Sequence, residues 1–416
     1  MGDKNMKTLI FSIIIILILS MSNIEITSAF KYSDNTDNKS STQAMSNGYG
    51  LQWMMEYGYN YEPNARFQGS QPIGDCDNDG KNELLISGRD CAIRVMEWDE
   101  NKQTYSEVHI LRPPLYPLVR CDAGGMAIGD VTNDGDNEVA ATWYTTVYKY
   151  VVSKYKIIGI NPYIFWNKGG SADCLIGDCD NDGKNEVILS GGGRSGFSSS
   201  RVGEITVFRW NGVYLQRVAE WKDPDTDGGY VYMAGLGDVD EDGENEIVCA
   251  TGYKVIVLNW DSQNKVFIPM KIYRTYGQVY PFGVVCKDCD NDGKAEILVS
   301  YYNPRITIFK WNGTGYQIQF DITWPDGEAV VEGIDVGDTD NDGLNEVCAG
   351  AGETHILQWN GTTYVEEAVL PTFGWMAVVC IGDCDNDGKN EINAGNVIVE
   401  SGKPYTEWVF KYGWGT

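Results

Sequence analysis

The chain has 416 residues, of which 59 are Asp or Glu and only 32 are Lys or Arg, so its formal net charge at pH 7 is −27. Such an acidic surface repels phosphate groups, which argues against nucleic acid or an anionic membrane as a partner. Aromatic residues make up 12% of the chain and there are 48 glycines. Short apolar runs separated by turns, with no long amphipathic helical pattern, predict an all-β protein.

The N-terminal segment predicts export. Residues 1–29 contain two lysines, an apolar run from Leu9 to Leu19 and the small residues before Phe30, which is typical of a signal peptide cleaved near Ala29. Because the apolar run is short for a membrane span, retention as an N-terminal anchor is the less favoured alternative. Residues 30–47 are polar and are predicted to form a disordered leader. We therefore expect a protein that is secreted or displayed on the cell surface, with no membrane insertion after cleavage.

A nine-residue pattern then recurs seven times, and we call each copy a motif loop. The copies begin at Asp75, Asp130, Asp178, Asp238, Asp288, Asp338 and Asp383. Neighbouring copies start 45 to 60 residues apart. Repeats of this length indicate a solenoid, an array or a propeller.

The residue types in the motif loop are those of a calcium site. Carboxylates stand at positions 1, 3, 5 and 9, and the position-7 carbonyl can add a backbone oxygen, which suits a hard cation that takes six to eight oxygens. Glycine at position 6 suits a turn residue with positive φ. An EF-hand is excluded because its loop needs Glu at position 12, where every copy here has an apolar residue or Cys. An acidic turn without an ion remains the alternative. The predicted ligands of up to seven structural Ca²⁺ ions are Asp75, Asp77, Asp79, Lys81, Glu83, Asp130, Thr132, Asp134, Asp136, Glu138, Asp178, Asp180, Asp182, Lys184, Glu186, Asp238, Asp240, Asp242, Glu244, Glu246, Asp288, Asp290, Asp292, Lys294, Glu296, Asp338, Asp340, Asp342, Leu344, Glu346, Asp383, Asp385, Asp387, Lys389 and Glu391.

The segments between the copies predict four-stranded blades. A β-type run follows each motif loop, and a later run ends in Trp before Asn-Gly, a strong hairpin signal, as at Trp210, Trp311 and Trp359. Each motif loop would thus join the first and second strands of one blade, with residues 48–416 forming seven blades. The last blade lacks a fourth strand, and the stretch Leu51–Tyr57 is expected to supply it, so that strands from both termini close the ring.

At these residues the sequence resembles the FG-GAP or VCBS repeat family, including the seven-bladed propellers of integrin alpha chains, and is also similar to certain fungal lectin propellers. The resemblance rests on the motif loops, on Phe282-Gly283 and Phe373-Gly374, and on the Gly-Asp that begins six of the copies. It implies a calcium-binding loop between the first two strands of each blade. Two departures are Thr132 at a ligand position and Lys287 in place of Gly before Asp288. The Thr132 loop is expected to be the weakest site, because a hydroxyl is a weaker ligand than a carboxylate.

Two further features leave alternatives open. The run Asp223–Gly228 imitates the first six motif positions and is interpreted as an acidic loop, with a weak extra ion as the alternative. The eleven cysteines are expected to be mostly small buried side chains, although an exported protein permits disulfides and Cys91 with Cys121 would be the first pair to test.

The sequence favours a binding protein over an enzyme. Its only two histidines, His109 and His355, lie in strand-like runs without a motif that would orient them for catalysis. Resemblance to integrin and lectin propellers implies a non-catalytic adhesion or recognition module for an extracellular glycan or protein ligand. The alternatives are a carbohydrate-active enzyme such as an acidic polysaccharide lyase, or a structural subunit of a surface assembly. Oligomeric state is not predicted. Aromatic residues expected on the face away from the motif loops could stack on sugars or pack between blades: Tyr116, Phe197, Tyr230, Tyr232, Tyr280, Trp324, Phe373 and Trp375.

Overall fold

A computed structural model describes residues 46–56, 71–88, 91–118, 124–161, 170–194, 201–225, 229–275, 280–324, 330–398 and 404–415. The expected signal peptide lies outside the described residues, as does the expected leader except for Ser46 and Asn47, which open a short 3₁₀ turn at Ser46–Gly48 (η1). Among the described residues no helix is long and apolar enough to span a membrane.

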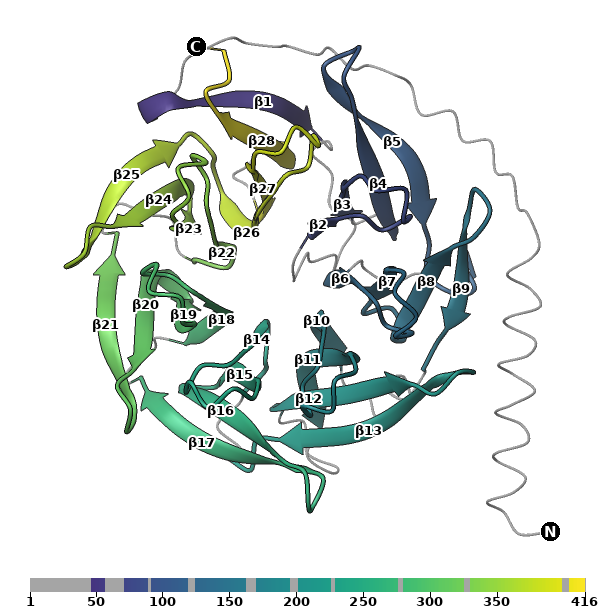
Figure 1. Ribbon diagram of the computed structural model, residues 1–416, viewed down its shortest axis with the longest axis vertical. Coiled ribbons are helices and arrows are strands. Elements are labelled where there is room, and N and C mark those ends of the chain that lie inside the picture. Colours follow the sequence, from purple (N-terminus) through teal and green to yellow (C-terminus); the bar gives the residue numbers. More distant parts are fainter. Residues whose placement is uncertain are drawn as a thin grey trace.

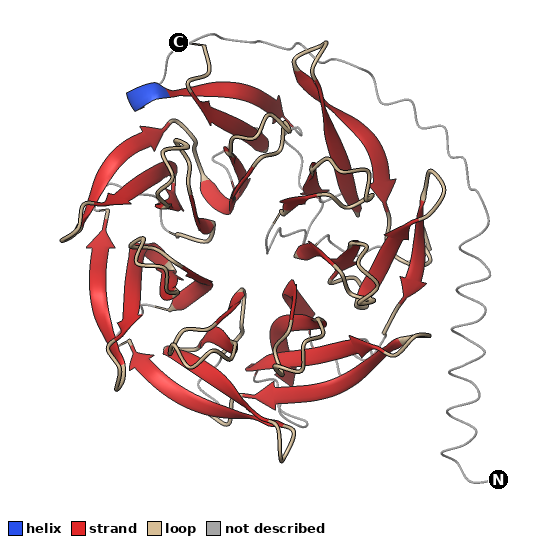
Figure 2. Ribbon diagram, viewed as in Figure 1, coloured by secondary structure: helices blue, strands red, loops and turns tan. Residues whose placement is uncertain are grey.

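The described residues form seven four-stranded antiparallel sheets arranged as a ring of blades (Figures 1 and 2). Blade 1 consists of β2 (Ile73–Gly74), β3 (Glu83–Gly88), β4 (Ala92–Asp99) and β5 (Thr104–Leu111). Blade 2 consists of β6 (Met126–Gly129), β7 (Glu138–Ala141), β8 (Thr146–Tyr150) and β9 (Tyr155–Gly159). Blade 3 consists of β10 (Gly170–Gly177), β11 (Glu186–Arg194), β12 (Arg201–Trp210) and β13 (Leu215–Lys222). Blade 4 consists of β14 (Ala234–Gly237), β15 (Glu246–Thr251), β16 (Lys254–Asp261) and β17 (Val266–Arg274). Blade 5 consists of β18 (Pro281–Lys287), β19 (Glu296–Tyr301), β20 (Asn303–Trp311) and β21 (Tyr316–Thr323). Blade 6 consists of β22 (Ile334–Gly337), β23 (Glu346–Ala351), β24 (Glu353–Trp359) and β25 (Tyr364–Leu370). The predicted all-β, seven-bladed propeller is confirmed.

Blade 7 contains both ends of the described chain, as predicted. Its strands are β26 (Trp375–Gly382), β27 (Glu391–Ile398), β28 (Thr406–Tyr412) and the N-terminal β1 (Tyr49–Glu56). β1 pairs with β28 from Tyr49 opposite Tyr412 to Glu56 opposite Thr406. The expected Leu51–Tyr57 segment therefore does supply the missing strand, starting two residues earlier and ending at Glu56.

The outer hairpin of each blade follows from its sequence. A register shift interrupts the pairing of the third and fourth strands in every blade, and such bulges increase strand twist. In six blades an aromatic residue ending the third strand contacts an aromatic residue at the start of the fourth, as Trp311 does with Tyr316 at 4.9 Å between ring centroids. The Trp residues that mark the third strands in the sequence thus close the hairpins.

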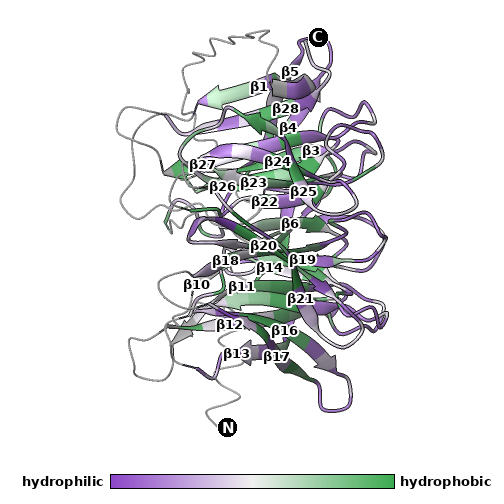
Figure 3. Cartoon of the chain, turned by 90° about the vertical axis from the view of Figure 1, so that its left-hand side faces the viewer, coloured by the Kyte–Doolittle hydropathy of each residue, from purple (hydrophilic) through white to green (hydrophobic). Residues whose placement is uncertain are grey.

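The two faces of the ring carry different connections. Turns between the first and second strands, and between the third and fourth, lie on one face, because strands in an antiparallel blade alternate in direction. The other face carries the turns from second to third strand and the crossings to the next blade. Seen from its edge, the ring bears hydrophilic loops, coloured purple, on the side of the motif loops (Figure 3).

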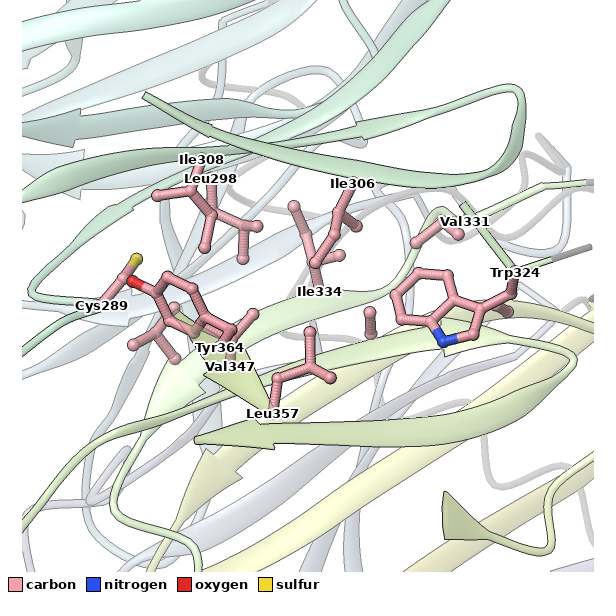
Figure 4. Packing of buried hydrophobic residues seen from close by; sticks show 13 residues of the cluster. Cys289, Leu298, Ile306, Ile308, Trp324, Val331, Ile334, Val347, Leu357 and Tyr364 are labelled. Carbon is pink, nitrogen blue, oxygen red and sulfur yellow. The ribbon is translucent and has the colours of Figure 1, made fainter. Parts of the chain in front are cut away.

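The apolar core lies between neighbouring blades. The largest cluster joins blade 5 to blade 6 through Leu298, Ile308, Val347 and Leu357. Tyr364 lies beside Cys289 at one end of the cluster, and Trp324 lies at the other end (Figure 4). Equivalent clusters join each of the other neighbouring blades, including blade 7 to blade 1. Removing a large side chain from such an interface costs about 2–5 kcal/mol. Stability is therefore distributed around the ring.

Glycine before the motif loop allows the blades to approach closely. A Cβ atom on Gly177 would lie 2.4 Å from a methyl group of Leu236 in the next blade, and the corresponding distances for Gly129, Gly237, Gly337 and Gly382 are 3.0–3.2 Å. At Gly74 the distance is 3.5 Å, which is ordinary van der Waals contact. In blade 5 this position is Lys287, whose Nζ donates to Asp335 Oδ1 at 2.5 Å and to the carbonyl of Val336 at 3.0 Å on β22. An interblade ion pair replaces the close packing there.

Candidate metal-binding loops

All seven motif loops join the first and second strands of their blades, as the sequence predicted. In each, the position-1 Asp accepts hydrogen bonds from the backbone N–H groups of positions 5 and 6, over 2.8–3.1 Å. The glycine at position 6 has φ between +83° and +94°, which a residue with a Cβ adopts only with strain. The same turn is therefore built seven times.

The position-9 Glu lies beneath each loop and is at most 2% exposed in every copy. Its Oε2 accepts a hydrogen bond from the backbone N–H of position 2, at 2.8 Å for Glu83 and Cys76. Burial raises the pKa of Glu83, Glu186, Glu346 and Glu391 to about 7 and that of Glu246 to about 8. A nearby cation would therefore stabilise the ionised form of these carboxyl groups.

Carboxylate oxygens converge in these loops. One oxygen from each of Asp75, Asp77, Asp79 and Glu83 lies within 4.8 Å of the others. In blades 3, 4, 5 and 6 the converging set comes from positions 1, 3 and 9. Positions 1, 3 and 9 thus converge in these blades, and position 5 joins the set in blade 1; that they bind a metal ion stays a prediction. Convergent oxygen donors of this kind suit Ca²⁺.

The second motif loop differs, as its sequence indicated. Thr132 Oγ1 donates to Glu138 Oε1 at 3.2 Å, so it uses its hydroxyl within the loop. Lys149 Nζ lies 2.8 Å from both Asp134 Oδ2 and Glu138 Oε1 and 3.3 Å from Asp136 Oδ2. Asp134 and Glu138, which were predicted as metal ligands, are thus ion-paired with a lysine.

Four loops contain such a cation, which the sequence analysis missed. It comes from the residue before the aromatic side chain that ends the third strand: Lys149, Arg209, Lys310 and Lys411. In blade 5, Lys310 Nζ lies 2.5 Å from Asp290 Oδ2, 2.7 Å from Asp292 Oδ2 and 2.8 Å from Glu296 Oε1. Aligning the third strands on their terminal aromatic residue would have revealed the recurrent cation.

Asparagines at positions 4 and 8 connect neighbouring loops, and they were also missed. Asn137 donates its backbone N–H to Asn78 Oδ1 at 2.7 Å and its side-chain Nδ2 to the carbonyl of Asp75 at 2.8 Å. We call this pair of bonds the asparagine latch. It recurs at six of the seven blade interfaces. Between blades 4 and 5 the two positions hold Glu241 and Ala295, and Lys294 pairs with Glu241 instead. The recurrence of Asn at positions 4 and 8 of the motif was the sequence signal from which the latch could have been predicted.

Cysteine stands at position 2 of four motif loops and is buried there. Cys76, Cys179, Cys289 and Cys384 are at most 1% exposed, and Cys76 Sγ lies 2.9 Å from Tyr155 Oη of the next blade. Nine of the ten described cysteines are buried, in agreement with the expectation of small buried side chains. Cys121 lies outside the described residues, so its pairing with Cys91 stays a prediction.

The acidic run after β13 is neutralised from within the chain. Lys254 is 1% exposed and its Nζ lies 2.6 Å from Asp223 Oδ2 and 3.0 Å from Asp225 Oδ2. Residues 226–228 lie outside the described residues. The ion pairs support the acidic-loop interpretation over an extra metal site.

The two histidines make packing contacts. His355 stacks on Trp324 at 4.5 Å between centroids, and its Nδ1 lies 2.7 Å from Glu366 Oε2. His109 contacts the rings of Tyr150 and Tyr155 at 5.4 Å. Both lie on strands, β5 and β24, as expected.

Aromatic side chains gather on the face away from the motif loops. Tyr232 stacks on Phe282 at 4.1 Å between centroids, Phe282 contacts Tyr302 and Trp375, and Tyr230 contacts Tyr232. We call these five residues the aromatic row. Beside it, Tyr253 and Tyr280 stack at 4.4 Å.

The other predicted aromatics behave differently. Trp324 is 8% exposed and belongs to the core between blades 5 and 6, so it offers no free ring. Phe373 packs edge-on against Trp408, and Arg112 lies over the ring of Tyr116. Phe197 lies outside the described residues. The packing alternative therefore holds for Trp324 and Phe373.

Comparison with known proteins agrees with this geometry. A family model described as FG-GAP-like repeat matches residues 288–349, which contain the motif loops of blades 5 and 6. The fold is similar to a solved structure described as "Structure of Dos1 propeller", with a TM-score of 0.51 and 11% identity over 82% of this chain and 79% of that chain. None of the curated proteins matches the chain. The chain is an all-β seven-bladed propeller with an FG-GAP-like repeat, consistent with an FG-GAP propeller.

Proposed function

We propose that this protein is a secreted or surface-displayed propeller, stabilised by Ca²⁺ in its motif loops, that acts as a non-catalytic adhesion or recognition module. The ligand would be an extracellular glycan or protein. The observation that carries the recognition part is the aromatic row, because it brings together rings from three blades on the face opposite the motif loops. Phe282, at its centre, is buried at 1% exposure, and Tyr302, at its edge, is 47% exposed.

Calcium binding is supported by the donor set. The converging oxygens come from carboxylates on a tight turn and from a buried Glu whose pKa is raised by burial. Oxygen donors without His or Cys ligands favour Ca²⁺ over transition metals. Since the loops lie at the blade ends and connect neighbouring blades through the asparagine latch, a bound ion would act on stability.

Recognition is supported by exposed rings at the edge of the row. Tyr302 is 47% exposed and Tyr280 is 38% exposed, although both contact other aromatic rings. Flat rings with a hydroxyl group can stack on the apolar face of a sugar or anchor a protein ligand while donating a hydrogen bond. Rings already fixed by neighbours lose little side-chain entropy on binding.

The test is a binding screen of the purified protein on a glycan array and against extracellular-matrix proteins, followed by affinity measurement for the ligands that bind. We expect Tyr280→Ala and Tyr302→Ala to weaken binding at least tenfold without lowering the melting temperature by more than a few degrees. Tyr214→Ala is the control, because Tyr214 is 46% exposed on the hairpin at the opposite face.

Other outcomes would redirect the assignment. Binding that survives in the double variant Tyr280→Ala/Tyr302→Ala contradicts recognition by this face. Turnover of an acidic polysaccharide by the wild-type protein would establish the enzyme alternative. Absence of any ligand together with co-assembly into a surface complex would favour the structural-subunit alternative.

A further inference from the structure

One position of each blade decides what occupies its motif loop. This position, which we call the gate position, precedes the aromatic residue that ends the third strand. In chain order it holds Glu97, Lys149, Arg209, Asn259, Lys310, Gln358 and Lys411. Four of the seven residues are cationic and three are not.

The cationic side chains lie at the centre of their loops. Lys411 Nζ contacts Asp385, lies 2.8 Å from Asp387 Oδ2 and 2.7 Å from Glu391 Oε1, and its side chain is only 6% exposed. Arg209 contacts the equivalent three carboxylates of blade 3, with Nη2 2.7 Å from Asp180 Oδ2. These are the oxygens that would otherwise bind a metal ion.

A metal ion and such a side chain exclude one another. A Ca²⁺ ion bound to the same oxygens would stand within a few Å of the ammonium or guanidinium group, and like charges at that separation repel strongly where water is partly excluded. In these four blades, the negative charge of the buried position-9 Glu is compensated by a Lys or Arg side chain of the same protein.

Among the described residues, no Lys or Arg forms an ion pair with the carboxylates at positions 1, 3, 5 and 9 of the loops in blades 1, 4 and 6. Glu346 is fully buried, and its Oε1 has no hydrogen-bond partner among the described residues, although Oε2 is bonded to the backbone of Thr339 at 2.8 Å. In blade 4, Asp240 Oδ1 is likewise buried without a partner in the described part of the chain, and so is Asp180 Oδ1 in blade 3. The two differ at the other oxygen, because Asp180 Oδ2 is paired with Arg209, whereas no described Lys or Arg forms an ion pair with Asp240. A buried carboxylate that the chain leaves without a cation is costly, so it indicates a cation supplied from solution.

A comparison of adjacent blades sharpens the contrast. In blade 5, Lys310 occupies the gate position and Gln319 Nε2 donates to Asp290 Oδ2 at 2.5 Å. In blade 6 the corresponding residues are Gln358 and Glu367, and Glu367 Oε2 is buried without a partner among the described residues. The exchange makes the surroundings of the blade 6 loop more negative by two charges.

We propose that the protein binds three Ca²⁺ ions, in the loops of blades 1, 4 and 6, and that Lys149, Arg209, Lys310 and Lys411 are tethered substitutes for calcium in the other four. This inference rests on the proposed calcium binding and adds its stoichiometry and its determinant. No two of the three metal loops are in neighbouring blades, so the solution ions are spread around the ring.

The experiment counts calcium in the full protein after chelator treatment and equilibrium dialysis against Ca²⁺, using elemental analysis. We expect three ions per chain. Lys310→Asn, which gives blade 5 the gate residue of blade 4, should raise the count to four. Asn259→Lys and Gln358→Lys should each lower it to two, and Lys156→Asn, an exposed strand residue of blade 2, should leave it at three.

The outcomes separate the two proposals. Seven ions in the wild type, or a Lys310→Asn variant that gains none while melting cooperatively, would overturn the gate assignment and leave calcium binding intact. No ions at all would refute calcium binding itself. Loss of an ion in Asn259→Lys provides an independent check that does not depend on the fold of the Lys310 variant.

Discussion

Burial of an ionisable group has its clearest consequence at Glu407 on β28. Its side chain is 4% exposed, and burial raises its pKa well above the ordinary value. A carboxyl whose pKa is higher in the folded than in the unfolded state costs no stability below the unfolded value, and costs progressively more as the pH rises toward the folded value. Glu407 therefore destabilises the protein at neutral and alkaline pH.

We predict that Glu407→Gln stabilises the protein at pH 8, because ionisation of the buried carboxyl group lowers the stability of the folded state and the amide does not ionise. The amide is nearly isosteric and carries no charge, so the gain should vanish near pH 4, where the carboxyl is neutral in both states. Thermal melts of both proteins at the two pH values test this. A variant less stable than wild type at pH 8 would show that the ionised carboxylate has a partner that stabilises it.

At the level of single residues, the sequence indicated the carboxylates that converge in the motif loops but not the side chains beside them. Seven repetitions made positions 1, 3, 5 and 9 visible because the pattern is local. The gate residues lie farther along the chain, as Lys310 lies 14 residues beyond Glu296, and only strand register brings them into the loop. Spacing between loop and third strand varies among blades, which hides the correspondence.

The asparagine latch connects the loops of neighbouring blades. Each latch joins the loop of one blade to the loop of the next through short bonds, and residue 4 has φ near +60° in every copy, a conformation that Asn tolerates better than most residues. The latch thus serves both the turn and the interface between blades.

We predict that Asn137→Ala lowers the free energy of unfolding by about 1 kcal/mol, because it removes the hydrogen bond to the carbonyl of Asp75. The natural counterpart is the interface between blades 4 and 5. The double variant Glu241→Asn/Ala295→Asn should introduce the missing latch there and raise stability. Denaturant unfolding measures both. If Asn137→Ala proved neutral, the latch would be incidental to the turn geometry.

The order of strands was predictable because its signals are also local. Motif loops marked the start of the second strand, and Trp followed by Asn-Gly marked the outer hairpin. Interblade contacts such as those of Lys287 with Asp335 could not be predicted, because they depend on which side chains meet after the ring closes.

The N-terminal strand β1 closes the ring of blades. Trp53 on β1 packs with Leu84, Ile86 and Tyr105 of blade 1 and with Val409 of blade 7. The first strand therefore completes one sheet and one interblade core at the same time, which should make the ring a single cooperative unit.

We predict that Trp53→Ala costs about 3–5 kcal/mol and that the protein nevertheless unfolds in one transition. The control is Trp98→Ala on the outer part of blade 1, where the side chain is only partly buried and the cost should be smaller. Calorimetry of both variants tests this. Separate unfolding of blade 7 in the Trp53 variant would contradict cooperative closure.

Thermal unfolding with and without calcium shows whether ions bound in the motif loops stabilise the propeller. The purified protein would be melted in excess chelator and then in saturating Ca²⁺. Each ion at one hundred times its dissociation constant adds about 2.7 kcal/mol to the native state, so we predict a rise in melting temperature of many degrees, saturating with the ion count. The same melting temperature in both conditions would show that the motif loops are acidic turns, and the account of a calcium-stabilised propeller would be wrong.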